Sequence, residues 1–242
     1  MTIIYGINPV LEALRAGRVS SVRVASRSDA RLTTVLQAAE KGGVDVRRVA
    51  QADLDRAASG RSHQGVVADV REPGRATIAD LVSGARDVPL LLVLDGIEDP
   101  QNVGAILRSV DAAGADGVVR QSRHAAPLGG AAAKASAGAV AHVRVADVVN
   151  IARALDELKE AGVWTVGLAG DAPRSYDEID LTLPTAFVVG AEGTGLRRLV
   201  REKCDWVASI PMRGHVGSLN ASVAAGIVLF EAVRQRRAAR AT

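Results

Sequence analysis

The feature that most constrains the fold is an uninterrupted apolar run, Leu90–Leu94, followed by alternating strand-like and helix-like segments. A strand that is apolar on both faces is typical of a parallel sheet covered by helices on both sides. The alternation of strands with helices favours the same architecture. We therefore expect an α/β fold with a mostly parallel sheet over residues 87–242.

The segments expected in this part follow hydrophobic periodicity and turn residues. The expected strands are Leu90–Leu94, Gly117–Val119, His142–Val145, Val163–Leu168, Ala186–Val189 and Val207–Ile210. The expected helices are Val103–Ala113, Ala131–Ala137, Ile151–Ala161, Leu196–Lys203 and about Leu219–Arg237.

Residues 1–70 predict a second, smaller α/β domain. Asn8-Pro9 is typical of a helix start, with Asn8 as the capping residue. Further segments are the strands Ser21–Ala25, Val44–Val49 and Gly65–Val70 and the helices Leu32–Lys41 and Ala52–Ala58. Residues 71–86 are expected to be a linker, with turn residues at Arg71–Arg75 and a short helix at Ile78–Val82.

The charge of the chain is unevenly distributed. The net charge is +3, and residues 1–70 carry 10 basic and 7 acidic side chains, whereas residues 87–242 carry 17 and 18. The smaller part therefore holds the excess positive charge, which indicates the part that meets an anion. Only two Trp, two Tyr and two Phe are present, which argues against a protein that stacks single-stranded bases on aromatic side chains.

Several chemistries lack their residues in this sequence. There is no Walker loop and no Gly-x-Ser-x-Gly elbow. His63, His124, His142 and His215 lie far apart, so we expect no metal site. A single cysteine, Cys204, cannot form an internal disulfide, and no apolar run is long enough to span a bilayer. We expect a cytoplasmic protein.

Three stretches carry polar residues and glycines where a strand ends and a helix begins. The first runs from Asp95 through Asn102 to Arg108, and Asn102 could cap the helix or direct its amide at a ligand. The second is residues 187–196, where glycines let the backbone approach a ligand and Glu192 would repel a pyrophosphate. The third, residues 209–222, enters the last helix through Ser218 and Asn220.

Taken together and in this order, these stretches resemble the three motifs of the SpoU (TrmH-like) family of RNA ribose 2′-O-methyltransferases. The first motif corresponds to residues 102–108, the second to residues 190–193, and the third to Ile210–Met212 together with Ser218–Asn220. Residues 5–14 resemble the opening of the substrate-binding domain attached to the rRNA branch of that family. One departure is residues 120–124, where relatives more often have a proline and an acidic residue.

The resemblance implies a fold, a cofactor and a set of site residues. It implies a SPOUT domain with a trefoil knot over residues 87–242, and a ribosomal-protein-L30e-like RNA-binding domain over residues 1–70. It also implies S-adenosylmethionine as the cofactor. The residues that would bind it are Gly167, Leu168, Gly190, Glu192, Gly195, Ile210, Met212, Ser218, Leu219 and Asn220. The residues implied as catalytic are Asn102, Arg108, Glu192, Ser218 and Asn220.

The role of Arg108 is open at the level of sequence. The family's matching residue is proposed as the general base, but a guanidinium stays protonated in nearly any protein environment. Arg108 could instead bind the adjacent phosphate and polarise the hydroxyl group.

The resemblance also bears on substrate and partners. The N-terminal domain favours a guanosine of 23S rRNA, in the peptidyl-transferase P loop. Relatives are homodimers built through the catalytic domain, so the resemblance implies the same homodimer here. A tRNA guanosine or another rRNA nucleotide is the alternative target. A non-catalytic RNA-binding or ribosome-assembly protein is the alternative from a different class.

Overall fold

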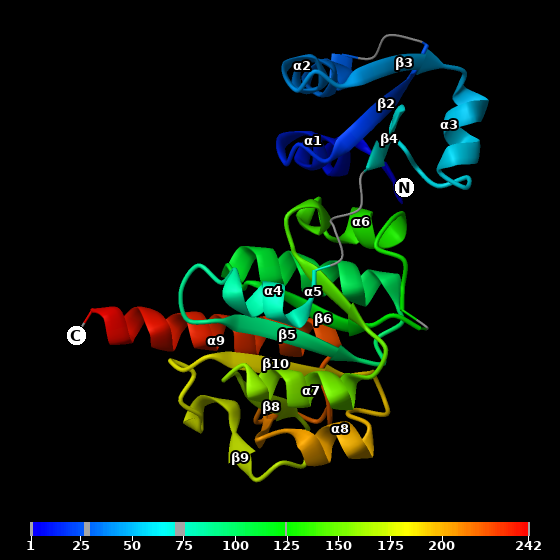
Figure 1. The fold of residues 1–242 in the computed structure, drawn as a ribbon. Helices are drawn as coiled ribbons and strands as arrows, with labels where there is room; N and C mark the ends of the chain where they lie inside the picture. The colour runs from blue at the N-terminus through cyan, green and yellow to red at the C-terminus, as the bar shows by residue number, and fades with distance from the viewer. Residues whose placement is uncertain (1, 27–29, 71–75, 124, 242) are drawn as a thin grey trace.

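The structure is a computed structural model that describes residues 2–26, 30–70, 76–123 and 125–241 of the 242-residue chain. Figure 1 shows a smaller part formed by the N-terminal residues and a larger part that contains the C-terminal helix. The expected turn at residues 71–75 and the position of His124 lie outside the described residues.

The smaller part is a four-stranded sheet with strand order β1-β4-β2-β3, in which only β2 and β3 pair in parallel. Its strands are β1 (Thr2–Tyr5), β2 (Val19–Ala25), β3 (Asp45–Val49) and β4 (Val66–Val70). Its helices are α1 (Ile7–Arg15), α2 (Thr33–Lys41) and α3 (Gln51–Ala57), with a 3-10 turn at Ala30–Leu32. The α1 and α2 helices pack on one face of the sheet, and α3 packs on the other face beside Tyr5 and Val67.

The start of α1 differs from the prediction. The helix begins at Ile7, and its N-cap is Gly6, whose φ of 96° lies in the region that favours glycine. The side-chain oxygen of Gln64 accepts a hydrogen bond from the Ile7 backbone N–H at 2.9 Å. Asn8 is therefore not the cap, because a side chain 57 residues away satisfies the first helical donor.

The larger part is a seven-stranded sheet with strand order β7-β6-β5-β10-β8-β11-β9, and every strand pair in it is parallel. Its strands are β5 (Leu90–Asp95), β6 (Gly117–Gln121), β7 (Val145–Val148), β8 (Trp164–Leu168), β9 (Arg174–Ser175), β10 (Thr185–Gly190) and β11 (Trp206–Ser209). Its helices are α4 (Ile78–Ser83), α5 (Pro100–Ala113), α6 (Ala131–Ala135), α7 (Ile151–Glu160), α8 (Arg198–Lys203) and α9 (Ala221–Arg240). The predicted α/β fold with a parallel sheet is confirmed, and the trefoil knot stays a prediction.

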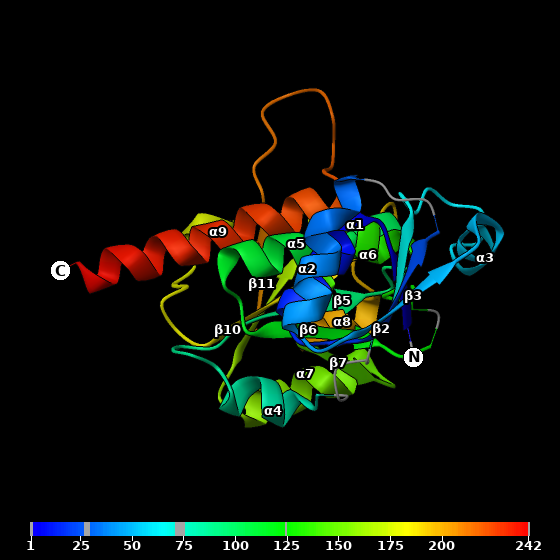
Figure 2. The ribbon, with the colours of Figure 1, turned by 90° about the horizontal axis from the view of Figure 1, so that it is seen from above.

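The central strand β5 is buried on both faces, as its apolar run predicts. Leu92 and Leu94 pack with α5 and α9, whereas Leu91 and Val93 pack with α4, α7 and α8. Figure 2 shows α5 and α9 along one side of the sheet and α4 and α7 along the other. Successive side chains of a strand point to opposite faces, so one apolar run supplies two cores.

One predicted strand is misplaced. Residues 142–145 were expected to form it, but the chain makes a 3-10 turn at Ala139–Ala141 and the strand β7 begins only at Val145. The Arg18 guanidinium of the smaller part donates hydrogen bonds to the backbone carbonyls of Val140 and Ala141. This contact from the smaller part stabilises the turn. The sequence around residues 139–145 does not indicate the contact, because its donor is more than 120 positions away.

The predicted division into residues 1–70, 71–86 and 87–242 stays a prediction. Within the middle range, α4 packs on the larger sheet, because Ile78 and Leu81 join the core formed with Leu91 and Val93. No helix in the described residues is long and apolar enough to cross a membrane.

Arg236 joins α9 to the amino ends of the two central strands. Its guanidinium donates hydrogen bonds to the backbone carbonyls of four residues that precede β5 and β10. The distances are 2.6 Å to Val88, 3.0 Å to Pro89, and 2.9 Å to each of Leu181 and Leu183. Burial lowers the pKa of Arg236, but a guanidinium remains charged at neutral pH.

This arrangement predicts that Arg236→Ala lowers the free energy of unfolding by about 2–3 kcal/mol, because four hydrogen bonds from a charged donor are lost. The Pro89 and Leu183 carbonyls still accept from Thr185. The matched control is Arg237→Ala, since Arg237 is exposed and adjacent in sequence. Urea denaturation followed by circular dichroism measures both variants. Equal stability of the two variants would contradict the role assigned to Arg236.

Candidate active site

A cavity of about 650 Å³ lies at the carboxyl ends of the central parallel strands. Ligands of open α/β sheets bind at this edge, outside the carboxyl ends of the strands. Its wall comes from the loops that follow β8, β10 and β11 and from the start of α9. The lining residues from the sequence prediction are Leu168, Gly190, Glu192, Gly195, Ile210, Met212, Ser218, Leu219 and Asn220.

The loop after β10 folds back on itself, and glycine makes this possible. The Gly195 N–H donates to the Ala191 carbonyl at 2.9 Å, which closes the loop. A Cβ atom at Gly190 would lie 2.2 Å from the carbonyl carbon of Gly195, so a side chain there would collide with backbone. Gly193 and Gly195 have φ values of 80° and 65°, in the left-handed region. The loop therefore presents main-chain groups to the cavity.

Three polar side chains from distant parts of the chain meet beside this loop. The Asn102 amide donates to Glu192 Oε1 at 3.2 Å. The Asn220 amide donates to Asn102 Oδ1 at 2.8 Å and to the same Glu192 oxygen. Glu192 and Asn220 lie 90 and 118 positions after Asn102 in the sequence. The fold therefore brings together the three stretches that the sequence singled out.

The two asparagines differ in their relation to the helix ends. Asp99 is the N-cap of α5, and its carboxylate accepts from the backbone N–H of Asn102. Asn102 is therefore inside the first turn, which frees its amide for Glu192. Asn220 is the N-cap of α9, where its Oδ1 accepts from Ser222 at 2.8 Å. Its amide nitrogen remains available for the other two side chains.

Arg108 does not join this group. It is exposed on α5, six residues after Asn102, which places it about two-thirds of a turn around the helix. It does not line the cavity. In the described part of the chain its guanidinium makes no hydrogen bond or ion pair.

Gly167 is the predicted cofactor residue that does not line the cavity. It is buried within β8, and a Cβ atom there would lie 2.8 Å from the Leu196 side chain and 2.9 Å from Cys204 Sγ. A glycine is needed at this position because the side chains of Leu196 and Cys204 occupy the space next to it. Burial raises the pKa of the neighbouring Cys204 thiol to about 12, so this thiol is protonated at neutral pH.

The sequence did not indicate two ion pairs, one in the cavity wall and one that follows the glycine loop. Arg201 donates to Asp171 at 3.0 Å, both line the cavity, and this hydrogen bond lowers the pKa of Asp171. Asp95, at the end of β5, is 1% exposed and accepts from the Arg197 backbone N–H at 2.8 Å and from its Nε at 2.6 Å. Asp95 and Asp171 each come shortly after a predicted strand. An acidic residue in this position is the sequence signal that could have identified both as site residues.

The Asp95–Arg197 pair fixes the chain just after the glycine loop. Asp95 is buried, whereas the Arg197 side chain is 52% exposed, so the two partners are not equivalent. No group of three His, Cys, Asp or Glu side chains that could hold a metal ion occurs among the described residues.

The chain matches two family profiles. Residues 89–230 match the SpoU rRNA Methylase family, and residues 3–76 match the RNA 2'-O ribose methyltransferase substrate binding family.

Similar proteins are found over nearly the whole chain. The 23S rRNA (guanosine-2'-O-)-methyltransferase RlmB of Vibrio cholerae is 44% identical, with 98% of each chain covered. An uncharacterized tRNA/rRNA methyltransferase of Mycolicibacterium vanbaalenii is 47% identical, over 98% of this chain and 77% of that protein. The crystal structure of the SpoU methyltransferase AviRb from Streptomyces viridochromogenes in complex with AdoMet has a TM-score of 0.82 and 28% identity, over 97% of this chain and 90% of that one.

The unequal burial of Asp95 and Arg197 predicts unequal costs of substitution. Arg197→Ala leaves a buried carboxylate without its charged partner and should lower the free energy of unfolding by about 3 kcal/mol. Asp95→Asn should cost only about 1–2 kcal/mol, because the half-exposed guanidinium regains water. The double variant should be more stable than Arg197→Ala alone. Urea denaturation measures all three, and a double variant less stable than Arg197→Ala would contradict this account.

Proposed function

This chain belongs to the SpoU rRNA methylase family, and we propose that it transfers the methyl group of S-adenosylmethionine to the ribose 2′-oxygen of a guanosine in 23S rRNA. The observation that carries this proposal is the contact of Asn102, Glu192 and Asn220 at the edge of the cavity. These three side chains come from the family's three motifs, and their hydrogen bonds fix them in one place.

The cavity fits S-adenosylmethionine in size, polarity and charge. Its volume of about 650 Å³ is within the usual range for a small-molecule site. Leu168, Ile210 and Leu219 offer apolar contact, and the loop closed between Ala191 and Gly195 offers backbone donors and acceptors. The Glu192 carboxylate attracts a sulfonium cation. When bound, the cofactor supplies an electrophilic methyl group.

The polar side chains then position the ribose. Methyl transfer needs an in-line approach of the 2′-oxygen, so orientation supplies much of the rate. We assign Asn102, Glu192, Ser218 and Asn220 to this task. Their amide, hydroxyl and carboxylate groups can hydrogen-bond a ribose hydroxyl.

We assign Arg108 to the RNA phosphate beside the reacting ribose. Its exposure and the absence of a carboxylate partner within the described chain leave its guanidinium available to an anion. A guanidinium binds a phosphate through two parallel N–H groups and does not give up its proton readily. The phosphate-bound arginine polarises the hydroxyl without accepting its proton, and the proton that the 2′-oxygen loses on methylation passes to solvent water.

The substrate assignment rests on the smaller part of the chain. Residues 3–76 match the substrate-binding profile, and residues 1–70 carry the excess positive charge, 10 basic against 7 acidic side chains. The relative from Vibrio cholerae is named for a guanosine of 23S rRNA. An rRNA substrate and a single free cysteine suit the cytoplasm.

We also propose a homodimer formed through the larger part. The α9 helix exposes Val223 and Phe230, which are 48% and 50% exposed and lie seven residues apart, on one face of the helix. Exposed apolar side chains on one face of a helix fit a second copy of the same surface.

The proposed function predicts that the protein transfers labelled methyl groups from S-adenosylmethionine to 23S rRNA, and that Arg108→Ala lowers this rate about 100-fold or more. Affinity for the cofactor, measured by calorimetry, should change less than about twofold, since the partner of Arg108 is RNA. Arg108→Lys should restore little, because Lys lacks the planar fork.

The matched control is Arg153→Ala, an exposed arginine on α7 that should leave the rate unchanged. Mapping of the modified nucleotide identifies the target. Near-normal transfer by Arg108→Ala would remove Arg108 from the mechanism, and no transfer by the wild type would overturn the proposed activity.

The proposed dimer predicts that Phe230→Glu shifts the protein toward a monomer in sedimentation velocity, because a carboxylate in an apolar interface is costly. Leu199→Glu on α8 is the control, since Leu199 is equally exposed and lies outside α9. A dimer that withstands Phe230→Glu as well as Leu199→Glu would refute this interface.

A further inference from the structure

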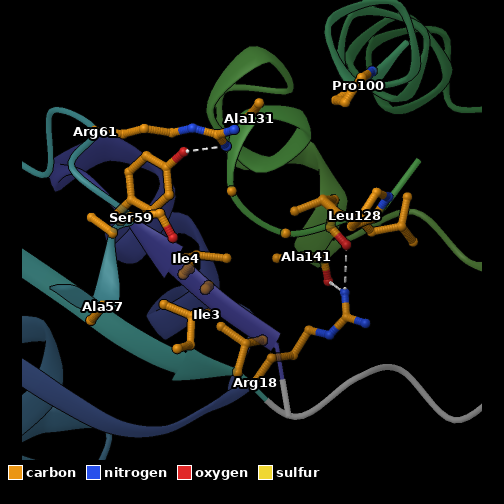
Figure 3. A pocket seen from close by; sticks show the side chains of 18 of the residues that line it. Ile3, Ile4, Arg18, Ala57, Ser59, Arg61, Pro100, Leu128, Ala131 and Ala141 are labelled. Atoms are coloured by element: carbon orange, nitrogen blue, oxygen red, sulfur yellow. Dashed lines mark hydrogen bonds between the residues drawn. The ribbon is translucent and has the colours of Figure 1, made fainter. Parts of the chain in front are cut away.

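A second cavity of about 650 Å³ lies between the two parts of the chain, away from the proposed cofactor site (Figure 3). One wall comes from β1, α3 and the loop after α3, with Ile3, Ala57 and Arg61. The other wall comes from the start of α5, residues 127–131 and the 3-10 turn at Ala139–Ala141.

Hydrogen bonds and apolar contacts join the two walls, so the cavity has a defined shape. Arg18 donates hydrogen bonds to the carbonyls of Val140, at 2.9 Å, and Ala141. The backbone N–H of Gly130 donates to the Ile3 carbonyl at 3.3 Å. Ala133 and Ala141 of the larger part lie in the same hydrophobic cluster as α1 and β4.

The cavity carries uncompensated positive charge. Its lining contains three arginines and one carboxylate, and Asp147 is already paired with Arg120 at 2.8 Å. Within the described ranges, Arg61 donates only to the Tyr5 hydroxyl, at 3.3 Å, and Arg18 only to backbone carbonyls. Neither has a carboxylate partner among the described residues, and burial lowers the pKa of Arg18 without removing its charge at neutral pH.

Most of the other lining side chains are apolar, and Ser59 and the Tyr5 hydroxyl are polar. Figure 3 shows Ile3, Ala57 and Leu128 around the space that Arg18 and Arg61 border. Apolar walls with two cations suit a ligand that combines a flat or apolar body with a phosphate. A nucleotide has this chemistry.

The position of the cavity relates it to the active site. Pro100, the first residue of α5, lines this cavity, whereas Asn102, two residues later, contacts Glu192 at the other one. Two helical positions differ by about 200° around the axis, so the two sites flank the first turn of α5. An RNA strand whose ribose reaches Asn102 therefore passes close to the inter-domain cavity.

We propose that the inter-domain cavity binds a nucleotide of the RNA substrate that neighbours the methylated one, with its phosphate on Arg61 and its base against the apolar wall. Arg18 adds positive charge on the other side of the cavity. This inference rests on the proposed function. It gives the smaller part a concrete task, because one side of this subsite belongs to β1 and α3 and the other to the larger part.

Two variants test the subsite by different means. Arg61→Ala removes an exposed cation, and Ala57→Phe fills space without a change of charge. The matched controls on α3 are Arg56→Ala and Ala52→Phe, since neither residue lines the cavity. Filter binding to purified 23S rRNA over a range of salt, methyl-transfer kinetics and cofactor calorimetry are measured for the full-length proteins.

Arg61→Ala should weaken rRNA binding and raise the KM for rRNA roughly tenfold, the usual effect of one lost charge-assisted contact. The salt slope of its binding should fall by about 0.7–0.9, as for one phosphate contact. Ala57→Phe should raise KM similarly with an unchanged salt slope. The kcat, the cofactor affinity and both controls should stay near the wild-type values.

The outcomes separate this inference from the function on which it rests. Weaker rRNA binding by both variants supports the subsite even if the wild type transfers no methyl group, a result that would overturn only the proposed activity. Methyl transfer with unchanged rRNA binding in Arg61→Ala and Ala57→Phe overturns the subsite and leaves the activity standing. Equal losses in Arg56→Ala and Ala52→Phe would also overturn it, since the effect would then belong to α3 as a whole.

Discussion

The active site depends on one hydrogen-bond acceptor, the Oε1 oxygen of Glu192, which receives the side-chain amides of both Asn102 and Asn220. Asn102 lies in the first turn of α5, Asn220 is the N-cap of α9, and Glu192 lies in the loop after β10. An amide donating to a carboxylate makes a stronger bond than one between neutral groups. The single carboxylate therefore ties two helices to the glycine loop, and the cofactor cavity lies where these elements meet.

The parallel sheet makes this meeting possible, because it places every strand end of one kind at the same edge. At the opposite edge, Arg236 of α9 holds four carbonyls that precede the central strands β5 and β10. The α9 helix is thus fixed near both ends, by Asn220 at its start and Arg236 near its finish. In the first turn of the α5 helix beside it, Pro100 lines the inter-domain cavity and Asn102 donates to Glu192, which lines the cofactor cavity. The α5 helix thereby links the proposed cofactor site to the proposed nucleotide subsite in the inter-domain cavity.

Features that depend on neighbouring residues were predictable from the sequence, whereas features that depend on residues distant in sequence were not. The apolar run of β5 predicted its burial on both faces, since alternation along a strand is a local property. The capping of α1 was predicted wrongly, because Gly6 and the distant Gln64 side chain replace Asn8. The strand expected at residues 142–145 begins three residues later, beside a turn that Arg18 contacts from the smaller part. Gly167 packs against Leu196 and Cys204, which the sequence did not indicate, and its assignment to the cofactor by resemblance stays a prediction.

The sequence by itself determined the fold class, the family resemblance and nine of the residues that line the cofactor cavity. These depend on the order of strands and helices and on short motifs whose glycines and polar residues are legible without a structure. The tertiary structure decided which side chains meet: Asn102 with Glu192 and Asn220, Asp95 with Arg197, and the smaller part with the larger one across a cavity. The physical reason is that local preference depends on neighbouring residues, whereas a contact between residues about a hundred positions apart depends on the path of the whole chain through the sheet.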